Sequence, residues 1–388
     1  MNGGSLKNVL MVFPSPFSAK RGAEDKLKAI VKKKLLANHI KVNKITSEET
    51  CIVFDVTDVV KAAELIVEVF GIDKVAIAKH VRSEFTEVVK TIVNIGKQII
   101  LPKEKFFVKV KVSSNTELHY VARDVEFASL GDLTAELSAI AAVPAKNEYD
   151  ANKIILSYIG GSSTYVCFQL DKAVGGLPFG CQNKIVSCGI HNVLSCISTL
   201  ITIKCGFIPD FSIFYTNQDD LRENVKLFGH IVTKMNTRKC KIRMMHLDLP
   251  DDKYGSRLKL MLKESISARA LTFLPRKDLT VSLSVTIYPP WFVQETVNRI
   301  SSAGKIPWVP LLFLTDCLYY DIKSMDLGDD KIIMYIDKLI GDTIGFKKYE
   351  YKKYEKKIDA LSKETINNMK TISLDIGPNY IHDIIDSI

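Results

Sequence analysis

The sequence predicts two α+β regions followed by a doubly wound α/β domain with a parallel sheet. The hydrophobic pattern of the first 80 residues follows the order strand, helix, strand, strand, helix, strand of a ferredoxin-like unit. From residue 181 onward, short apolar strands alternate with helices, which is typical of a parallel sheet with helices on both faces. The glycine-rich stretch 171–180 has no hydrophobic period and separates the two patterns.

Elements of the first region follow from short runs of apolar residues. Leu27, Val31 and Leu35 recur at helical spacing and form one face of a helix. A second helix is capped by Thr57 or Asp58 and ends at Gly71. The expected elements are a strand at 7–13, a helix at 22–36, two strands within 41–56, a helix at 57–72 and a strand at 74–80.

The second and third regions are assigned by the same periodicities. The second comprises a helix at 83–99, a strand at 105–114, a helix at 130–142 and a hairpin at 153–170 that turns at Gly160 and Gly161. The third comprises strands at 184–187, 210–216 and 241–249, helices at 192–204, 219–235 and 255–268, later strands near 281–288 and 309–315, a helix at 329–341 and a charged, partly exposed helical tail at 346–370. We therefore expect domains at 1–73, 74–172 and 181–388, with a linker at 173–180.

Positive charge is concentrated in the first third of the chain. The net charge is +9, and residues 1–50 carry ten Lys/Arg against four Asp/Glu. The segment 97–111 holds five lysines and one glutamate. This pattern suits a polyanionic partner. The alternative is a solvated lysine-rich surface.

Cysteine usage and hydropathy indicate a reduced, non-membrane protein. None of the eight cysteines forms a C-x-x-C pair, and no Cys/His spacing fits a zinc site, so we expect no zinc. No run of eighteen apolar residues occurs, and the N-terminus lacks the features of a signal peptide. We expect a cytoplasmic protein without membrane contact.

One short segment has the pattern of a strand, a tight loop and a helix. In "CQNKIVSCGIHNVLSCIST" (181–199), the strand is expected to end at 184–186, the loop to cover 187–192 and the helix to begin at Val193. Loops of this shape bind phosphate through backbone N–H groups and the helix N-terminus. The sequence therefore predicts a nucleotide site at Ser187–Asn192.

The three regions together resemble the tRNA 4-thiouridine synthetase (ThiI) family, whose middle module is the THUMP domain. The string "GGLPFGCQNKIVSCGIHN" (175–192) is similar to the G-G-L-P-x-G-x-x-G-K linker and the S-G-G-x-D-S loop of the family's PP-loop domain. The string "FFVKVKVSSNTELHYVARDVEFASLGDL" (106–133) resembles the THUMP core, and "MDLGDDKIIMYIDKLIG" (325–341) is similar to a late family segment.

The resemblance implies a function in tRNA modification. In the family, the first two domains bind the tRNA acceptor end, and the PP-loop domain uses ATP and Mg²⁺ to adenylate a uridine oxygen that a sulfur donor then replaces. A sulfur-carrier protein and a second copy of the chain are further implied partners. The residues implied to bind RNA are Lys20, Arg21, Lys105, Lys109, Lys111 and Arg123, of which the three on the strand at 105–114 share one face and Arg123 is expected in the loop after it.

The nucleotide-binding residues implied by the family pattern depart from it at three positions. They are Ser187, Cys188, Gly189, Ile190, His191 and Asn192. Cys188 replaces a glycine that lets the backbone approach phosphate, and His191 replaces an aspartate although Mg²⁺ prefers oxygen ligands. Asn192 replaces a serine and is expected to cap the helix. At a helix N-terminus the pKa of Cys188 would be lowered, which makes it the candidate catalytic thiol.

These departures lead to three hypotheses. The first is a tRNA-binding pseudoenzyme in which ATP-dependent adenylation is lost or weakened. The second is an active tRNA sulfurtransferase with an altered loop, in which His191 contacts phosphate directly. The third is a nucleotide domain that serves a small-molecule transferase, with the first two domains as dimerisation modules.

Overall fold

The chain divides into two compact units, which we call the N-terminal unit (Met1–Gly176) and the C-terminal unit (Leu177–Ile388). The computed structural model describes residues 7–16, 23–114, 116–160, 163–235, 239–249, 256–275, 279–285, 288–310 and 347–375. Both units combine helices with a sheet that contains parallel and antiparallel strands, so the predicted mixed α/β class is confirmed.

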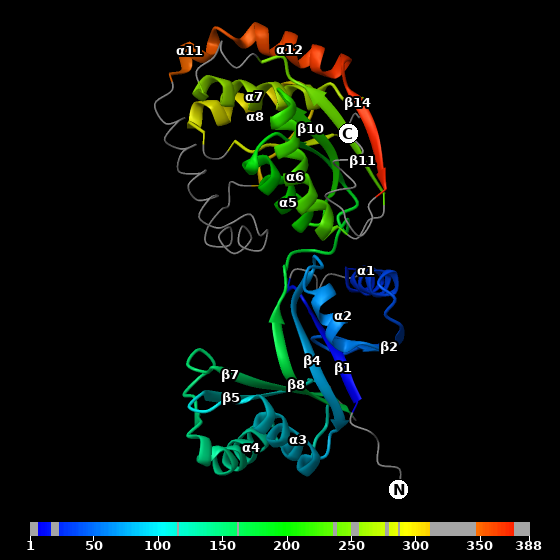
Figure 1. The fold of residues 1–388 in the computed structure, drawn as a ribbon, viewed down its shortest axis with the longest axis vertical. Helices are drawn as coiled ribbons and strands as arrows, with labels where there is room; N and C mark the ends of the chain where they lie inside the picture. The colour runs from blue at the N-terminus through cyan, green and yellow to red at the C-terminus, as the bar shows by residue number, and fades with distance from the viewer. Residues whose placement is uncertain are drawn as a thin grey trace. The chain divides into compact units, whose positions relative to one another are not determined.

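The N-terminal unit contains an eight-stranded sheet in the order β2-β3-β1-β4-β8-β7-β5-β6 (Figure 1). The predicted boundary at residue 73 falls near the start of β4, which pairs with β1 on one side and with β8 on the other. The strands are β1 (Lys7–Pro14), β2 (Val42–Ser47), β3 (Ile52–Val56), β4 (Ile72–Arg82), β5 (Lys105–Val112), β6 (Val143–Pro144), β7 (Lys153–Gly160) and β8 (Ser163–Lys172).

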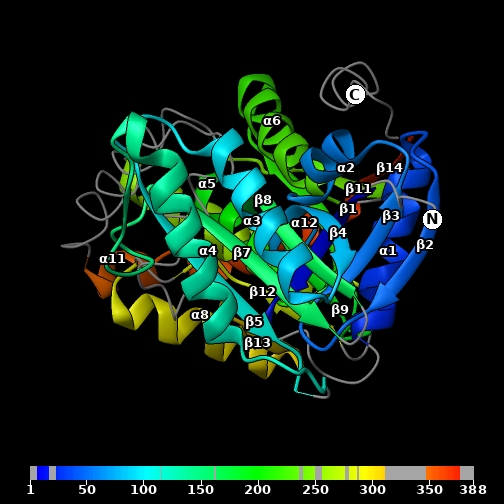
Figure 2. The ribbon, with the colours of Figure 1, turned by 90° about the horizontal axis from the view of Figure 1, so that it is seen from below.

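Four helices complete this unit: α1 (Ala23–Ala37), α2 (Val59–Ile66), α3 (Phe85–Ile99) and α4 (Ala122–Leu137). Figure 2 shows α3 and α4 lying across β5, β7 and β8. The two helices approach closely at Gly96, where an added Cβ would lie 2.4 Å from the Leu133 side chain.

The helix predicted at 130–142 is α4, which begins at Ala122, eight residues earlier than expected. It starts earlier because Val125 and Ser129 extend its buried face toward the N-terminus.

The C-terminal unit contains a six-stranded sheet in the order β13-β12-β9-β10-β11-β14. Five strands are parallel and β14 is antiparallel at the edge. The strands are β9 (Ile185–Ile190), β10 (Ile208–Tyr215), β11 (Lys239–His246), β12 (Thr280–Ser282), β13 (Ile306–Trp308) and β14 (Lys370–Asp375). Since β10 and β11 lie on one side of β9 and β12 lies on the other, the strand order reverses between β9 and β12.

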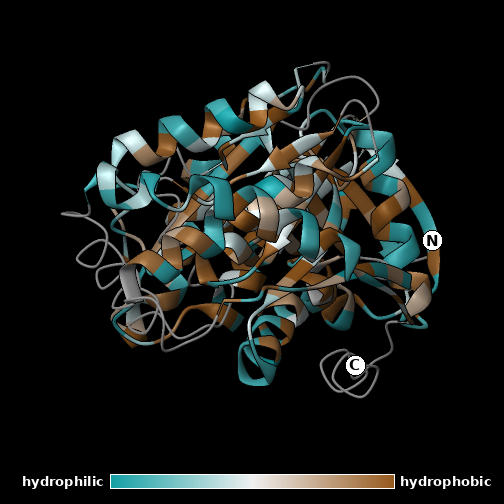
Figure 3. Cartoon of the chain, turned by 90° about the horizontal axis from the view of Figure 1, so that it is seen from above, coloured by the Kyte–Doolittle hydropathy of each residue, from teal (hydrophilic) through white to brown (hydrophobic). Residues whose placement is uncertain are grey.

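The helices of this unit carry hydrophilic and hydrophobic residues in alternation, as Figure 3 shows for helices throughout the chain. They are α5 (Val193–Lys204), α6 (Gln218–Lys234), α7 (Ser256–Thr272), α8 (Pro290–Ser302), α11 (Lys348–Lys352) and α12 (Glu355–Asn367). The sequence did not predict α8. Its Pro290 occupies the start of the helix, where proline is tolerated, rather than breaking it.

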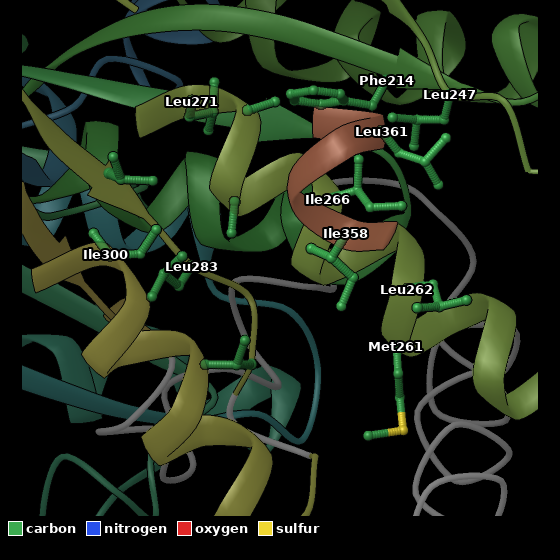
Figure 4. Close-up of a cluster of buried hydrophobic side chains, with 14 of the residues drawn as sticks. Phe214, Leu247, Met261, Leu262, Ile266, Leu271, Leu283, Ile300, Ile358 and Leu361 are labelled. Atoms are coloured by element: carbon green, nitrogen blue, oxygen red, sulfur yellow. The ribbon is translucent and has the colours of Figure 1, made fainter. Parts of the chain in front are cut away.

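The core of the C-terminal unit is built around α7. Figure 4 shows Ile266 of α7 close to Ile358 and Leu361 of α12, and Leu271 of α7 belongs to the same buried cluster. Tyr351 is also buried there, and its hydroxyl lies 2.6 Å from the Ser265 Oγ. The prediction of a helical, partly exposed segment at 346–370 is confirmed for the residues that the structure describes, and one face of the segment is buried against α7. Although the segment is rich in lysine and glutamate, Tyr351, Ile358 and Leu361 form a buried stripe that packs against α7.

Several predicted elements lie outside the described residues. These are the helix at 329–341 and most of the strand at 309–315. Among the helices that the structure describes, none has both the length and the apolar composition needed to cross a bilayer.

Candidate functional site

The reversal of strand order between β9 and β12 defines where a ligand would bind in a sheet of this kind. In doubly wound folds, ligands occupy the crevice beyond the carboxyl ends of the strands at such a point. His191 and Asn192 follow β9 directly, and Ser284 lies two residues beyond β12. The candidate nucleotide site is therefore at these residues.

The predicted loop at 187–192 is mostly strand. Ser187, Cys188, Gly189 and Ile190 belong to β9, and only His191 and Asn192 follow it. Pairing with β10 on one side and with β12 on the other holds the segment extended. The expectation of a loop is wrong because neither pairing is visible in the local sequence.

Cys188 is fully buried within β9 and is not at a helix N-terminus. Burial raises the pKa of its thiol to about 12, although the Thr199 side chain opposes the shift by a hydrogen bond. The predicted lowering of this pKa is wrong. A buried, protonated thiol is a poor nucleophile, so the structure gives no support to Cys188 as a catalytic residue.

His191 forms a buried pair with Glu264 of α7. The His191 Nε2 atom lies 2.8 Å from the Glu264 Oε2 atom, and the two side chains are only 4% and 3% exposed. Ser284 donates its hydroxyl to the same Oε2 atom at 2.7 Å. The ring of His191 also packs edge-on against Phe214. Its Nδ1 atom has no hydrogen-bond partner among the described residues.

This environment keeps Glu264 ionised. Burial alone raises the pKa of its carboxyl, but the attraction of His191 and the hydrogen bonds from His191 and Ser284 outweigh burial and leave the pKa lowered. His191 Nε2–H therefore donates to a carboxylate. The pair thus places a carboxylate at the strand reversal whose Oε2 atom already interacts with His191 and Ser284.

Three backbone N–H groups at the N-terminus of α5 donate within the turn itself. The N–H groups of His191 and Asn192 both donate to the Ser195 Oγ, at 2.9 and 3.0 Å. The N–H of Ser195 donates to the Asn192 Oδ1 at 2.8 Å, so Asn192 is the N-cap that the sequence predicted. The N–H groups of Asn192 and Ser195, which are among those that a phosphate at this helix N-terminus would use, are therefore occupied.

A second charged pair lies beyond the carboxyl end of the neighbouring strand β10. Lys263 Nζ lies 2.6 and 2.8 Å from the two carboxylate oxygens of Asp220, at the start of α6. Burial raises the pKa of Asp220, but Lys263 and hydrogen bonds from Thr216 outweigh it and lower the pKa. Sequence reasoning missed Lys263 and Glu264. The signal was two adjacent charges that directly follow the apolar run Leu260–Leu262 in α7.

The residues at this edge do not fit a triphosphate with Mg²⁺. The backbone at Gly189 is covered, because an added Cβ would lie 2.9 Å from the Phe214 ring. Glu264 is a carboxylate, but its Oε2 is already engaged by His191 and Ser284. In the described part of the chain, no group of three or more His, Cys, Asp and Glu side chains is arranged to hold a metal ion.

The polar face of β5 forms a second candidate site. Lys105, Lys109 and Lys111 point to one face, as predicted, while Phe106 and Val108 point into the core with α3 and α4. Lys105 Nζ lies 2.6 Å from Asp150, and Lys109 is paired with Glu148. Lys111 is exposed and makes no ion pair with any described residue.

The other implied RNA contacts are placed differently. Arg123 lies in the first turn of α4 and not in a loop, and its guanidinium lies over the Phe127 ring at 5.4 Å from the centroid. The N-terminus of α4 begins earlier than the sequence suggested, which accounts for the difference. Lys20 and Arg21 lie outside the described residues.

The turn between β2 and β3 fixes the end of β5. Glu49 accepts hydrogen bonds from the Ser113 hydroxyl at 2.9 Å and from the Ser114 hydroxyl and N–H, both at 2.7 Å. Hydrogen bonds from Ser114 contribute most to the lowered pKa of Glu49. The lysine-bearing strand is therefore held at the end that follows Lys111.

Comparison with known proteins identifies the fold. No family model matches the chain, and no curated protein matches it. The protein PH1313 from Pyrococcus horikoshii Ot3 shares the fold over 82% of this chain and 98% of its own, with a TM-score of 0.58 and 17% identity. A 4-thiouridine synthetase, solved as an RNA complex with bound ATP, matches over 95% of this chain and 99% of its own, with a TM-score of 0.62 and 11% identity. The chain therefore has a fold like that of a 4-thiouridine synthetase along nearly its whole length.

Proposed function

We propose that this chain binds a structured RNA, with tRNA as the first candidate, through the lysine face of β5. The proposal rests on the fold shared with a synthetase that was solved with RNA and on the three cations that β5 presents on one face. Lysines on a folded surface bind phosphates and release counterions from the nucleic acid. A THUMP assignment for residues 74–172 and a homodimer stay predictions.

We further propose that ATP-dependent adenylation is lost or strongly weakened. The buried His191–Glu264 pair carries this proposal, because it occupies the strand reversal with a carboxylate that is already engaged, while the N–H groups of His191, Asn192 and Ser195 are used within the turn. The chain would then hold RNA without modifying it. An active sulfurtransferase that uses a sulfur-carrier protein is the second candidate, favoured by the ATP bound in the synthetase of similar fold.

The RNA role is tested by replacing Lys109 and Lys111 with glutamine together. We expect tRNA affinity to fall about tenfold at physiological salt, because two phosphate contacts are lost. The slope of log affinity against log salt should decrease by about two. A gel-shift titration at several salt concentrations measures both quantities.

The matched control replaces Lys90 and Lys97 of α3 with glutamine. These residues are exposed and give the same change in net charge, but α3 packs against the opposite face of β5. Equal losses in the two double variants would show that only net charge matters and would contradict a binding surface on β5. Absence of tRNA binding by the unaltered chain would favour the small-molecule transferase hypothesis.

A further inference from the structure

An aromatic side chain is fully exposed beside the lysine face of β5. Tyr149 has a relative exposure of 101%, the highest among the exposed large hydrophobic residues that the structure describes. It lies in the loop 145–152, which leads from β6 into β7. Exposed tyrosines on ordered loops are common contact residues, since the ring offers a large apolar surface at low entropic cost.

The loop that carries Tyr149 is held by a network of hydrogen bonds. The Asn147 Oδ1 accepts the N–H groups of Tyr149 and Asp150, each at 3.0 Å. The N–H of Lys105 donates to the Asn152 Oδ1 at 2.8 Å, and the N–H of Asn152 donates to the Lys105 carbonyl at 2.8 Å. The ring is therefore displayed by a fixed backbone.

The two neighbours of Tyr149 anchor the loop to the lysines of β5. Glu148 pairs with Lys109 and Asp150 pairs with Lys105. A lysine hydrogen bond is the main cause of the lowered pKa of Asp150, so this carboxylate stays ionised. Tyr149 is consequently held next to two cations that lie along one strand.

The surface around Tyr149 has the charge and the aromatic content that an unpaired nucleotide requires. We define the β5 surface as Lys105, Phe107, Lys109 and Lys111 together with the loop 145–152. It holds four lysines, including Lys146, against the two carboxylates of Glu148 and Asp150, a surplus of two positive charges. Phe107 lies on the lysine face of the strand and is partly exposed. Aromatic side chains interleaved with cations are typical of surfaces that bind single-stranded nucleic acid.

We propose that Tyr149 stacks on an unpaired base of the bound RNA while the lysines of β5 hold the adjacent phosphates. This inference rests on the proposed RNA-binding function and deepens it, because it assigns the base-contacting residue and selects unpaired nucleotides over a duplex. Bases in a duplex are already stacked on each other, whereas an unpaired base has a free face. Stacking does not depend on base identity, so the site would tolerate any sequence.

The test compares Tyr149→Ala with Tyr149→Phe on two RNAs, a single-stranded oligonucleotide and a blunt duplex of the same length. We expect Tyr149→Ala to weaken single-strand binding by about fivefold to a hundredfold. Tyr149→Phe keeps the ring and should stay within about twofold of the unaltered chain, and neither variant should change duplex binding. Fluorescence anisotropy with labelled RNA measures the affinities. Since Tyr149 is fully exposed, both variants should unfold at the same temperature as the unaltered chain.

Each contrary outcome has a distinct meaning. If Tyr149→Ala binds the single strand as the unaltered chain does, the stacking role is overturned, while the proposed function stands on the effect of Lys109 and Lys111. An equal loss in Tyr149→Phe would assign the effect to the hydroxyl, and an equal loss on the duplex would remove the selectivity for unpaired bases. Either result overturns the inference. If the unaltered chain binds tRNA but not the single strand, the inference fails while the proposed function stands, and if it binds no RNA at all, tRNA included, both fail.

Discussion

Replacing Glu264 with alanine is expected to lower the free energy of unfolding of the C-terminal unit by about 3–5 kcal/mol. The substitution removes the only described partner of His191 Nε2 and leaves the Ser284 hydroxyl without its acceptor, both in a buried site. Both tryptophans, Trp291 and Trp308, lie in this unit, so tryptophan fluorescence during denaturation reports on it selectively.

The control is Glu364→Ala on the exposed side of α12, which should change the stability by less than about 0.5 kcal/mol. A loss below about 1 kcal/mol in Glu264→Ala would contradict a strongly coupled buried pair.

The same pair predicts how stability depends on pH. The pKa of Glu264 in the folded chain lies below its ordinary value of 4.5, so the folded state binds the proton less readily than the unfolded state does. The contribution of the Glu264 carboxylate to the free energy of unfolding is therefore fully present above pH 4.5. It is lost as the pH falls through the lowered pKa. Glu264→Gln should lack this acid-dependent loss, which denaturation at a series of pH values would detect.

Replacing His191 with aspartate is expected to destabilise the C-terminal unit by about 3 kcal/mol or more and to give no adenylation activity. The change restores the carboxylate of the family pattern, but it places that carboxylate against Glu264 in a site that is closed to water. Two adjacent buried carboxylates cannot both ionise. The edge-on contact of the ring with Phe214 is lost as well.

A double variant separates repulsion from lost packing. His191→Asp combined with Glu264→Gln should recover part of the lost stability, since only one carboxylate remains. Tryptophan fluorescence measures the unfolding of each variant. Full stability of His191→Asp alone, with a gain of activity, would show that the crevice accepts a catalytic carboxylate and would contradict the closed site.

Local periodicity accounts for what the sequence predicted well. The alternation of lysines with apolar residues in β5 depends only on neighbouring residues, so the shared face of Lys105, Lys109 and Lys111 was readable. The cap by Asn192 follows from local preference as well. The order of the elements from β1 to β5 was correct for the same reason.

Contacts between distant residues account for what the sequence did not reveal. Glu264 lies 73 positions from His191, and Glu148 lies 39 positions from Lys109. The extension of β9 through Ile190 depends on pairing with β10, and β12 pairs with β9 as far as Cys188. The apolar stripe with Tyr351, Ile358 and Leu361 was obscured by lysines and glutamates in the same segment. The substitution at position 191 was visible in the sequence, but its partner was not.

ATP–pyrophosphate exchange by the unaltered chain, with Mg²⁺ and tRNA present, tests the central claim most directly. The gel shift of the same preparation with tRNA shows that the chain is folded and binds RNA. The closed crevice at His191 and Glu264 predicts exchange no higher than the background without protein. Exchange above that background, abolished by His191→Ala, would contradict the account and would identify His191 as a phosphate contact in an active enzyme.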